Sequence, residues 1–269
     1  MEGVTLRKYR PRHVWLQQIV KYYWMLTSDK RVAFNNKLFP ANNIDFIINL
    51  SSPIQYRDAN GKETFAGAHF SGLSNDCRTI QQEGLLDVVG ISFFSAGAYA
   101  VLKKPMWEFS NRIVELTEVL NHFESLGCLK YLPTDKERID AVEHLLLQVI
   151  DKEEASIPLL QHFIASVYHS NMCIRVNDYC RASGINQKTL ERTFKKRVGI
   201  SPKSFIRKTR FQQALGHAID RNYNTLTALA YDMGYFDQTH FVKDFQYYMH
   251  TSPLKFAKAN NSVKELLEI

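Results

Sequence analysis

Cys180-Arg-Ala-Ser-Gly184-Ile185 and Ala230-Tyr-Asp-Met-Gly234-Tyr235 are two copies of one pattern, and they decide how the C-terminal part of the chain folds. They lie 50 residues apart, and after one added residue the match continues at an offset of 51. The later matches are Leu190 and Phe194 with Phe241 and Phe245, Ser201-Pro202 with Ser252-Pro253, and Phe205 with Phe256. Apolar and turn positions repeated in one register indicate two copies of one structural unit.

Each copy has the pattern of a helix-turn-helix. A helix ends at a glycine, which adopts the left-handed conformation at little cost, so Gly184 and Gly234 are predicted to be the turns. Asn186 and Asp237 follow at the position of an N-cap, where a side-chain oxygen accepts hydrogen bonds from the free amides of the next helix. We therefore expect two tandem helix-turn-helix units.

The second helix of each unit is predicted to present a polar outer face. Its inner stripe is Leu190, Phe194 and Val198 in the first unit and Phe241, Phe245 and Met249 in the second. The outer faces then hold Gln187, Lys188, Glu191, Arg192, Lys195 and Lys196 in the first unit and Gln238, Thr239, Val242, Lys243 and Gln246 in the second. Arginine suits guanine, glutamine suits adenine, and valine can contact a thymine methyl group. One such face could be an ordinary solvated surface, but two in one register favour DNA reading.

A single helix is predicted to join the two units. Ser201 is a natural N-cap and Pro202 a natural first helical residue, and the helix should run to about Ile219. A rigid connection would hold both reading helices on one face of B-DNA, in successive major grooves about 34 Å apart.

The positive charge of the chain is concentrated in this region. Residues 166–269 contain 16 Lys and Arg against 8 Asp and Glu, a net charge of +8, whereas residues 1–165 contain 18 against 19, a net charge of −1. A concentrated basic region is expected of a surface that meets phosphates.

The first 125 or so residues are predicted to form mainly strands. Short runs rich in β-branched and aromatic residues occupy 38–39, 44–50, 54–56, 64–66 and 88–94. Asn60-Gly61 is a tight-turn signal, because both residues tolerate positive φ, and a helix is expected over 96–102. Strands at this spacing indicate a small sandwich or barrel.

Helices are expected from Lys136 onward. Ile139, Val142, Leu146 and Val149 fall on one apolar stripe, which could pack inside its own chain or pair with a second copy as a homodimer. The acidic segment 151–154 precedes a second helix. We predict three regions: a sensor domain over 1–130, a helical linker and dimerisation region over 131–165, and a DNA-binding domain over 166–269.

Several classes of protein are excluded by composition and spacing. The four cysteines and nine histidines show no zinc-binding pattern, so we expect no metal and no cofactor. No apolar run reaches the ~18 residues of a membrane span, and the N-terminus lacks a signal-peptide pattern. We expect a cytoplasmic protein with no membrane partner.

The repeat region resembles the AraC/XylS family of bacterial transcription regulators. The residues that carry the resemblance are Gly184-Ile185-Asn186, Leu190 to Lys195, Gly199 to Pro202, Arg210, Ala230 and Gly234 to Phe241. The resemblance covers roughly 166–260. It implies a seven-helix domain with two recognition helices, attached to a domain that senses a ligand or mediates dimerisation, in a transcription regulator whose partners are double-stranded DNA and RNA polymerase. We expect an activator, but the sequence leaves open whether transcription rises or falls.

Residue roles follow from this resemblance by position. The base-contacting residues would be Lys188, Glu191, Arg192, Gln238, Thr239, Val242 and Lys243. We predict phosphate contacts from Gln187, Lys195, Lys196, Arg207, Lys208 and Gln246. One position departs from the family: the glycine present as Gly199 in the first unit is His250 in the second. His250 must therefore tolerate a left-handed conformation or reshape the turn.

The N-terminal part resembles the cupin-like sensor domains attached to this family, through Phe39-Pro40, 45–50, Gly72 and 90–98. The predicted fold class is therefore α+β: a cupin-like β-sandwich or barrel with helices, then an all-α domain of two helix-turn-helix units. Trp15, Trp24, Phe46 and Phe93 are candidates to line a pocket for a small-molecule effector, although such aromatic residues can also be simple core.

Three functions are compared. The first is a DNA-binding regulator modulated by a small ligand of the N-terminal domain, and the second is a regulator controlled there by a protein partner. The third is an enzyme with a DNA-binding tail, resembling the adaptive-response methyltransferase, which needs a four-cysteine zinc site near the N-terminus. Only Cys77 and Cys128 lie in that region, so we expect no enzymatic activity.

Overall fold

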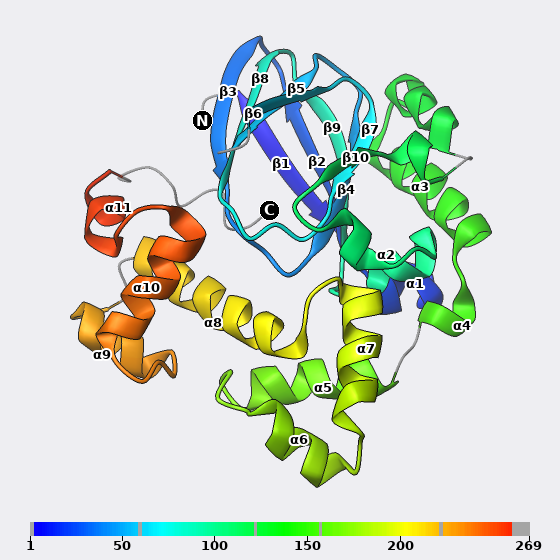
Figure 1. The fold of residues 1–269 in the computed structure, drawn as a ribbon. Coiled ribbons are helices and arrows are strands. Elements are labelled where there is room, and N and C mark those ends of the chain that lie inside the picture. Colours follow the sequence, from blue (N-terminus) through cyan, green and yellow to red (C-terminus); the bar gives the residue numbers. More distant parts are fainter. Residues whose placement is uncertain (1–2, 59–60, 121–122, 156–157, 221–222, 260–269) are drawn as a thin grey trace.

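The computed structural model describes residues 3–58, 61–120, 123–155, 158–220 and 223–259, and it separates a β-rich N-terminal part from a helical C-terminal part. Strands β1 to β10 lie within residues 4–115, and helices α5 to α11 lie within residues 158–259 (Figure 1). The α+β layout predicted from the sequence is confirmed.

Two antiparallel sheets build the N-terminal part. The larger has the order β1 (Val4–Tyr9), β2 (Val20–Ser28), β9 (Asp87–Phe93), β4 (Ile44–Asn49), β7 (Ala68–Ser71) and β10 (Ile113–Glu115). The smaller has the order β3 (Val32–Leu38), β8 (Arg78–Gly84), β5 (Ile54–Asp58) and β6 (Gly61–Phe65). The predicted strands coincide with β4, β5, β6, β9 and the end of β3. β5 and β6 form a hairpin that pairs Asp58 with Gly61, and Asn60 of the predicted turn lies outside the described residues.

The core of this part is aromatic. The Phe46 ring centroid lies 4.7 Å from that of Phe93 and 5.5 Å from that of Phe70, and all three side chains are fully buried. Because β4, β7 and β9 are neighbours in the larger sheet, these rings interdigitate on one face of it. Helix α1 (Val14–Ile19) precedes β2, and α2 (Gly97–Leu102) and the 3₁₀ helix η1 (Met106–Phe109) lie between β9 and β10. The 3₁₀ helices η2 (Leu116–Glu118) and η3 (Phe123–Tyr131) follow β10.

Helix α3 (Asp135–Val149) begins with a capping box, in which Thr134 and Glu137 exchange side-chain-to-backbone hydrogen bonds. Its apolar residues Ile139, Val142 and Leu146 are buried in the same core as the larger sheet. Of the two alternatives for this stripe, the structure shows packing inside its own chain.

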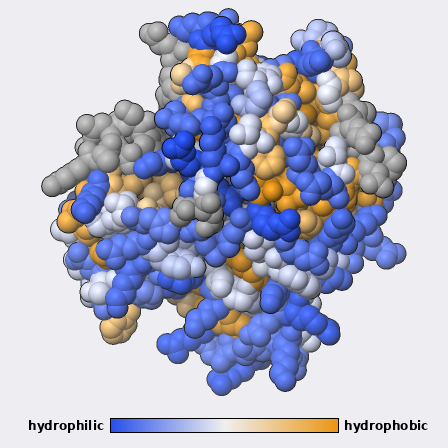
Figure 2. Space-filling model, turned by 45° about the horizontal axis from the view of Figure 1, so that its top comes forward, coloured by the Kyte–Doolittle hydropathy of each residue, from blue (hydrophilic) through white to orange (hydrophobic). Residues whose placement is uncertain are grey.

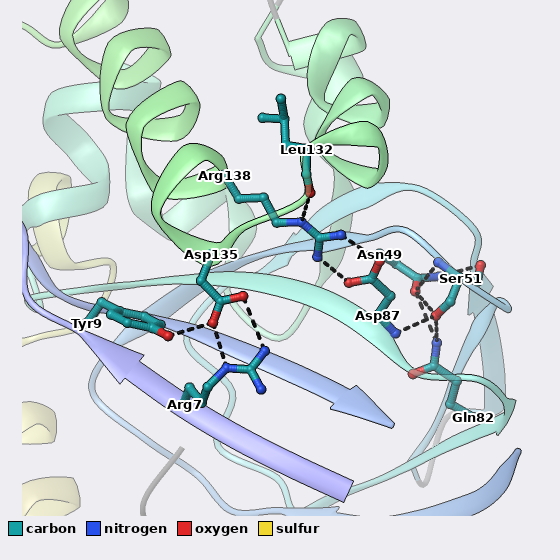
Figure 3. Close-up of polar contacts among 9 residues, drawn as sticks. All are labelled: Arg7, Tyr9, Asn49, Ser51, Gln82, Asp87, Leu132, Asp135 and Arg138. Carbon is teal, nitrogen blue, oxygen red and sulfur yellow. Dashed lines mark hydrogen bonds and ion pairs between the residues drawn. The ribbon is translucent and has the colours of Figure 1, made fainter. Parts of the chain in front are cut away.

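Ion pairs fix α3 against the sheet (Figure 3). Asp135 accepts hydrogen bonds from Arg7 Nε at 2.6 Å and Tyr9 Oη at 2.5 Å, while both Arg138 terminal nitrogens donate to the Asp87 carboxylate. Burial opposes ionisation of Asp135, but the hydrogen bonds from Arg7 and Tyr9 outweigh it and lower the pKa of Asp135. The helix therefore belongs structurally to the N-terminal part.

Helix α5 (Pro158–His169) follows α4 (Lys152–Ala155) and packs with the C-terminal helices. Its fully buried Phe163 makes edge-to-face contacts with Phe194 and Tyr179, at centroid distances of 5.4 and 4.9 Å. The domain boundary predicted between residues 165 and 166 falls inside this helix. Its buried stripe of Leu160, Phe163 and Val167 packs with the first repeat through Phe163.

The remaining helices are α6 (Val176–Ser183), α7 (Gln187–Val198), α8 (Pro202–Ile219), α9 (Leu226–Asp232), α10 (Gln238–Met249) and α11 (Pro253–Ala259). α8 lies between the other pairs, with α6 and α7 near one end and α9 and α10 near the other (Figure 1). Its Phe205 packs on Phe194 of α7, and its Phe211 packs on Phe245 of α10. One helix thus supplies a core residue to each repeat.

Most of the face in Figure 2 is hydrophilic, with apolar residues gathered in separate patches. Within the described residues, no helix is both long enough and apolar enough to cross a membrane.

Candidate nucleic-acid interface

The two turns have the predicted geometry. Gly184 has φ = 68° and Gly234 has φ = 72°, both in the left-handed region that favours glycine. Asn186 Oδ1 then accepts from the backbone amide of Lys188 at 2.9 Å, and Asp237 Oδ1 accepts from that of His240 at 2.7 Å. The caps begin α7 and α10, and these helices occupy equivalent places in the two repeats.

Burial of one stripe on each helix leaves the predicted reading face outward. Leu190, Phe194, Phe241 and Phe245 are all 0% exposed. The predicted base-contacting residues Lys188, Glu191, Arg192, Gln238, Thr239 and Lys243 are exposed, and Val242 is half-buried. The structure therefore brings three of these residues together on α7 and four on α10.

Two of the predicted base-contacting side chains, Glu191 and Gln238, already accept hydrogen bonds within the protein. Gln187 Nε2 donates to Glu191 Oε1 at 2.8 Å along α7, and Thr227 Oγ1 of α9 donates to Gln238 Oε1 at 2.6 Å. The second bond leaves the Gln238 amide nitrogen as its donor toward a base, so Gln238 is partly oriented before any ligand arrives.

Two of the residues predicted to contact phosphates instead hold the protein together. Lys208 is 1% exposed, and its Nζ donates to the carbonyl oxygen of Ser74 at 2.9 Å, so it cannot reach DNA in this arrangement. Arg207 pairs with Asp244 of α10 at 2.7–2.8 Å and lies over the Tyr247 ring. The burial of Lys208 is incompatible with its predicted role in this arrangement, whereas the Arg207 side chain is 43% exposed and its phosphate contact stays a prediction. Helical periodicity does not reveal that α8 faces the N-terminal part and α10.

The other predicted phosphate contacts remain accessible. Gln187, Lys195, Lys196 and Gln246 are exposed. Lys195 Nζ lies 6.0 Å from the Trp107 ring centroid and Lys196 Nζ lies 5.3 Å from that of Tyr99, which places residues of the N-terminal part beside α7. Such contacts at exposed sites are weak, about 0.5–1 kcal/mol, and leave both lysines able to reorient.

His250 ends α10 with φ = 52°, so it occupies the left-handed position that Gly199, with φ = 97°, holds in the first repeat. Its Nε2 lies 3.0 Å from Asp76 Oδ1, in the segment between β7 and β8. Of the two outcomes open at this position, the structure shows the first: histidine keeps the turn. Sequence reasoning did not identify Asp76, because no motif links it to the repeat.

The comparison with protein families agrees with this geometry. A family described as "Helix-turn-helix domain" matches residues 179–259, the span from the end of α6 to α11. The chain carries an AraC-type helix-turn-helix domain at its C-terminal end. A second family, described as a domain of unknown function (DUF6597), matches residues 7–115, which contain most of the β-sandwich in front of the AraC-type domain.

The chain is also similar to several solved structures. ToxT from Vibrio cholerae is 14% identical, with a TM-score of 0.48 over 97% of this chain and 100% of ToxT. ToxT described as bound to an unsaturated fatty acid is 12% identical, with a TM-score of 0.43 over 89% and 99% of the two chains. The AraC-like transcriptional activator CuxR is 13% identical, with a TM-score of 0.26 over 80% and 87%. No curated protein matches the chain.

The N-terminal part contains a cavity of about 410 Å³ between its sheets and α8. Of the four aromatic candidates, Trp24 lines this cavity, together with Tyr22, Phe34 and Phe39. Phe46 is fully buried in the core. Phe93 borders a second cavity, which lies near α5. Trp15 lines neither cavity. Within the described residues, no group of His, Cys, Asp and Glu could hold a metal ion.

Proposed function

We propose that this protein is a sequence-specific DNA-binding transcription regulator that reads two successive major grooves with α7 and α10. The observation that carries the proposal is the pairing of two capped helices, each with one stripe fully buried and the opposite face open. Major-groove reading needs this arrangement, because the helix must present side chains while its core side stays packed. We also propose that the protein has no enzymatic activity.

The connection between the helices supports simultaneous reading. α8 has 18 residues and is therefore about 27 Å long. Phe205 near its start and Phe211 in its middle belong to the cores of the two repeats. A continuous helix anchored in both cores resists bending, so the separation between α7 and α10 is held before DNA binds.

Charge favours the first repeat as the main source of affinity. With Arg207 and Lys208 engaged elsewhere, the exposed cations of α7 are Lys188, Arg192, Lys195 and Lys196, whereas α10 exposes Lys243. Each lysine or arginine that neutralises a phosphate increases the salt dependence of binding. α10, with Gln238 and Thr239, is proposed to contribute more to sequence preference than to affinity.

The test begins with selection of bound fragments from genomic DNA by the full chain, followed by affinity measurements on a selected site. Arg192→Ala should weaken specific binding about 10- to 100-fold and relax preference at one base pair, the effect of losing ~1–3 kcal/mol at a base contact. Lys195→Ala should weaken all sequences alike and flatten the salt slope by about 1. Lys62→Ala, which removes an exposed cation from β6, is the matched control. Unchanged binding by all three variants contradicts the proposal.

We further propose that a small ligand in the 410 Å³ cavity modulates DNA binding, because that volume lies within the ~300–1,000 Å³ of ligand sites. Trp24 lines it, and its buried indole Nε1 has no hydrogen-bond partner among the described residues. The alternative is control by a protein partner. Thermal-shift screening of metabolites separates the two, since a ligand raises stability by mass action and Leu38→Trp, at the cavity wall, should abolish the shift. No shift with any metabolite favours the protein partner.

Contact with RNA polymerase and homodimer formation stay predictions, to be tested by co-purification and sedimentation.

A further inference from the structure

A larger cavity, of about 720 Å³, lies between the N-terminal part and the helices of the AraC-type domain. Gln17 and Gln18 of α1 and Phe93 to Gly97, between β9 and α2, form one wall. Leu160 to Tyr168 of α5 and Gln212 of α8 contribute the other. We call it the interdomain cleft; it is distinct from the cavity that Trp24 lines, although Lys21, Asn43 and Gln212 border both.

The cleft has apolar walls that include two incompletely buried aromatic rings. Phe94 is 46% exposed and Tyr168 is 48% exposed, and they come from the two different sides. Ile164 and Leu160 of α5 extend this apolar surface. Aromatic and aliphatic walls of this kind bind the ring system of a small molecule.

Several polar groups of the cleft are side-chain amides, and the amide nitrogens of Gln17 and Asn42 are already engaged. Gln17 Nε2 donates to the carbonyl oxygens of Pro11 and Arg12, each at 3.2 Å. Asn42 Nδ2 donates to Thr209 Oγ1 at 2.8 Å and to the Phe205 carbonyl oxygen at 3.3 Å. A carbonyl oxygen can only accept, so these bonds settle which amide atom is the nitrogen.

Two amide oxygens at the cleft are acceptors without a donor. Asn42 Oδ1 and Gln18 Oε1 are buried and accept no hydrogen bond within the described part of the chain, and Asn42 is only 5% exposed. A buried acceptor without a donor is unfavourable, and a ligand carrying an O–H or N–H group would supply that donor after a small adjustment of these side chains.

The charges at the cleft are balanced. Glu154 forms an ion pair with Arg197 of α7, and the Lys21 ammonium interacts with the Asp45 carboxylate. Neither a strongly anionic nor a strongly cationic molecule is favoured by this lining. We propose that the interdomain cleft is a second small-molecule site, which takes an uncharged molecule with an aromatic body and at least one O–H or N–H donor.

Occupancy of this site couples to domain arrangement. Because its walls come from both parts of the chain, a molecule in the cleft contacts both walls only while the N-terminal part is docked on α5 and α8. It therefore stabilises that arrangement by mass action. This inference concerns binding alone and does not rest on DNA recognition.

The test uses the full chain and a matched pair of probes, 4-phenylphenol, which carries an O–H donor, and biphenyl-4-carboxylate, an acceptor-only anion. Ligand-observed NMR and thermal shift measure binding. Ala165→Trp places a large ring in the cleft from an exposed position of α5, and Ala182→Trp adds the same ring to an exposed position of α6 as the control. Leu38→Trp obstructs the other cavity.

The expected result is binding of 4-phenylphenol at least tenfold tighter than of biphenyl-4-carboxylate, weakened at least tenfold by Ala165→Trp and unchanged by Ala182→Trp and Leu38→Trp. Loss of binding with Leu38→Trp but not with Ala165→Trp would place the molecule in the other cavity and overturn the inference, while leaving the proposed regulator intact. Preference for the carboxylate, or no binding of either probe at millimolar concentration, also overturns it.

Discussion

Lys208 Nζ of α8 lies 2.9 Å from the carbonyl oxygen of Ser74, in the segment that joins β7 and β8. The lysine is 1% exposed, and burial lowers its pKa to about 8, an effect that the nearby Asp76 carboxylate partly opposes. A buried cation thus anchors the helix between the two repeats to the N-terminal part.

This anchor predicts a specific pH dependence. Between pH 8 and about 10.5 the unfolded chain, with an ordinary lysine pKa of 10.5, binds more protons at Lys208 than the folded protein does. The contribution of Lys208 to stability therefore rises with pH across this window, by on the order of 3 kcal/mol. Below pH 8 the charged lysine is present in both states and its burial cost is largest.

The measurement compares wild type with Lys208→Met in denaturant unfolding from pH 7 to 10.5. The free energy of unfolding of the variant minus that of wild type should fall as the pH rises. Taking the difference cancels the contributions of all other titrating groups, which the two proteins share. Lys203→Met, at an exposed position on the same helix, should show no such trend. A pH-independent difference for Lys208→Met would contradict the assignment.

The N-caps of the recognition helices should be equivalent in strength. Asn186→Ala and Asp237→Ala each remove the acceptor for free amides in the first turn, and each should lower the free energy of unfolding by ~1 kcal/mol. Asn177→Ala, exposed within α6, is the control and should change stability little. If both cap variants unfold at the wild-type denaturant midpoint, the caps contribute nothing.

The pair of Arg207 and Asp244 should be sensitive to loss of the cation. The Asp244 side chain is 2% exposed, and Arg207→Met leaves its carboxylate buried without the guanidinium. Removing one partner of a fully buried pair costs roughly 3 kcal/mol. The Arg207 side chain is 43% exposed, so the loss of stability should be smaller than this, on the order of 1–2 kcal/mol. The double variant Arg207→Met/Asp244→Leu should recover part of the loss. Additive effects in this double-mutant cycle would show that the two residues are not coupled.

His250 should be sensitive to branching at Cβ. Its φ of 52° costs an L-residue roughly 1–2 kcal/mol, least for residues that tolerate the left-handed region. His250→Gly and His250→Val both remove the contact with Asp76, so their comparison isolates the backbone. The valine variant should be less stable than the glycine variant by ~1–2 kcal/mol. Equal stability of the two in thermal unfolding would show that the turn relaxes.

Local patterns determined much of the C-terminal half. Glycines at 184 and 234, capping residues at 186 and 237 and buried residues every four positions predict helix ends and inner faces, because turn geometry, capping and amphipathic burial act over a few residues. The strands around Phe46 and Phe93 were predicted for the same reason. The boundary between residues 165 and 166 stays a prediction, because the stripe on α5 has no local mark of which core it joins.

Tertiary structure alone decided what each outward residue does. Lys188, Arg192, Arg207 and Lys208 are all basic and helical, yet the first two stay exposed while Arg207 meets Asp244 and Lys208 meets Ser74. Those partners lie 37 and 134 residues away in the chain. A helical repeat specifies which residues share a face, but the partner of that face depends on long-range packing, which the spacing of residues along one helix does not encode.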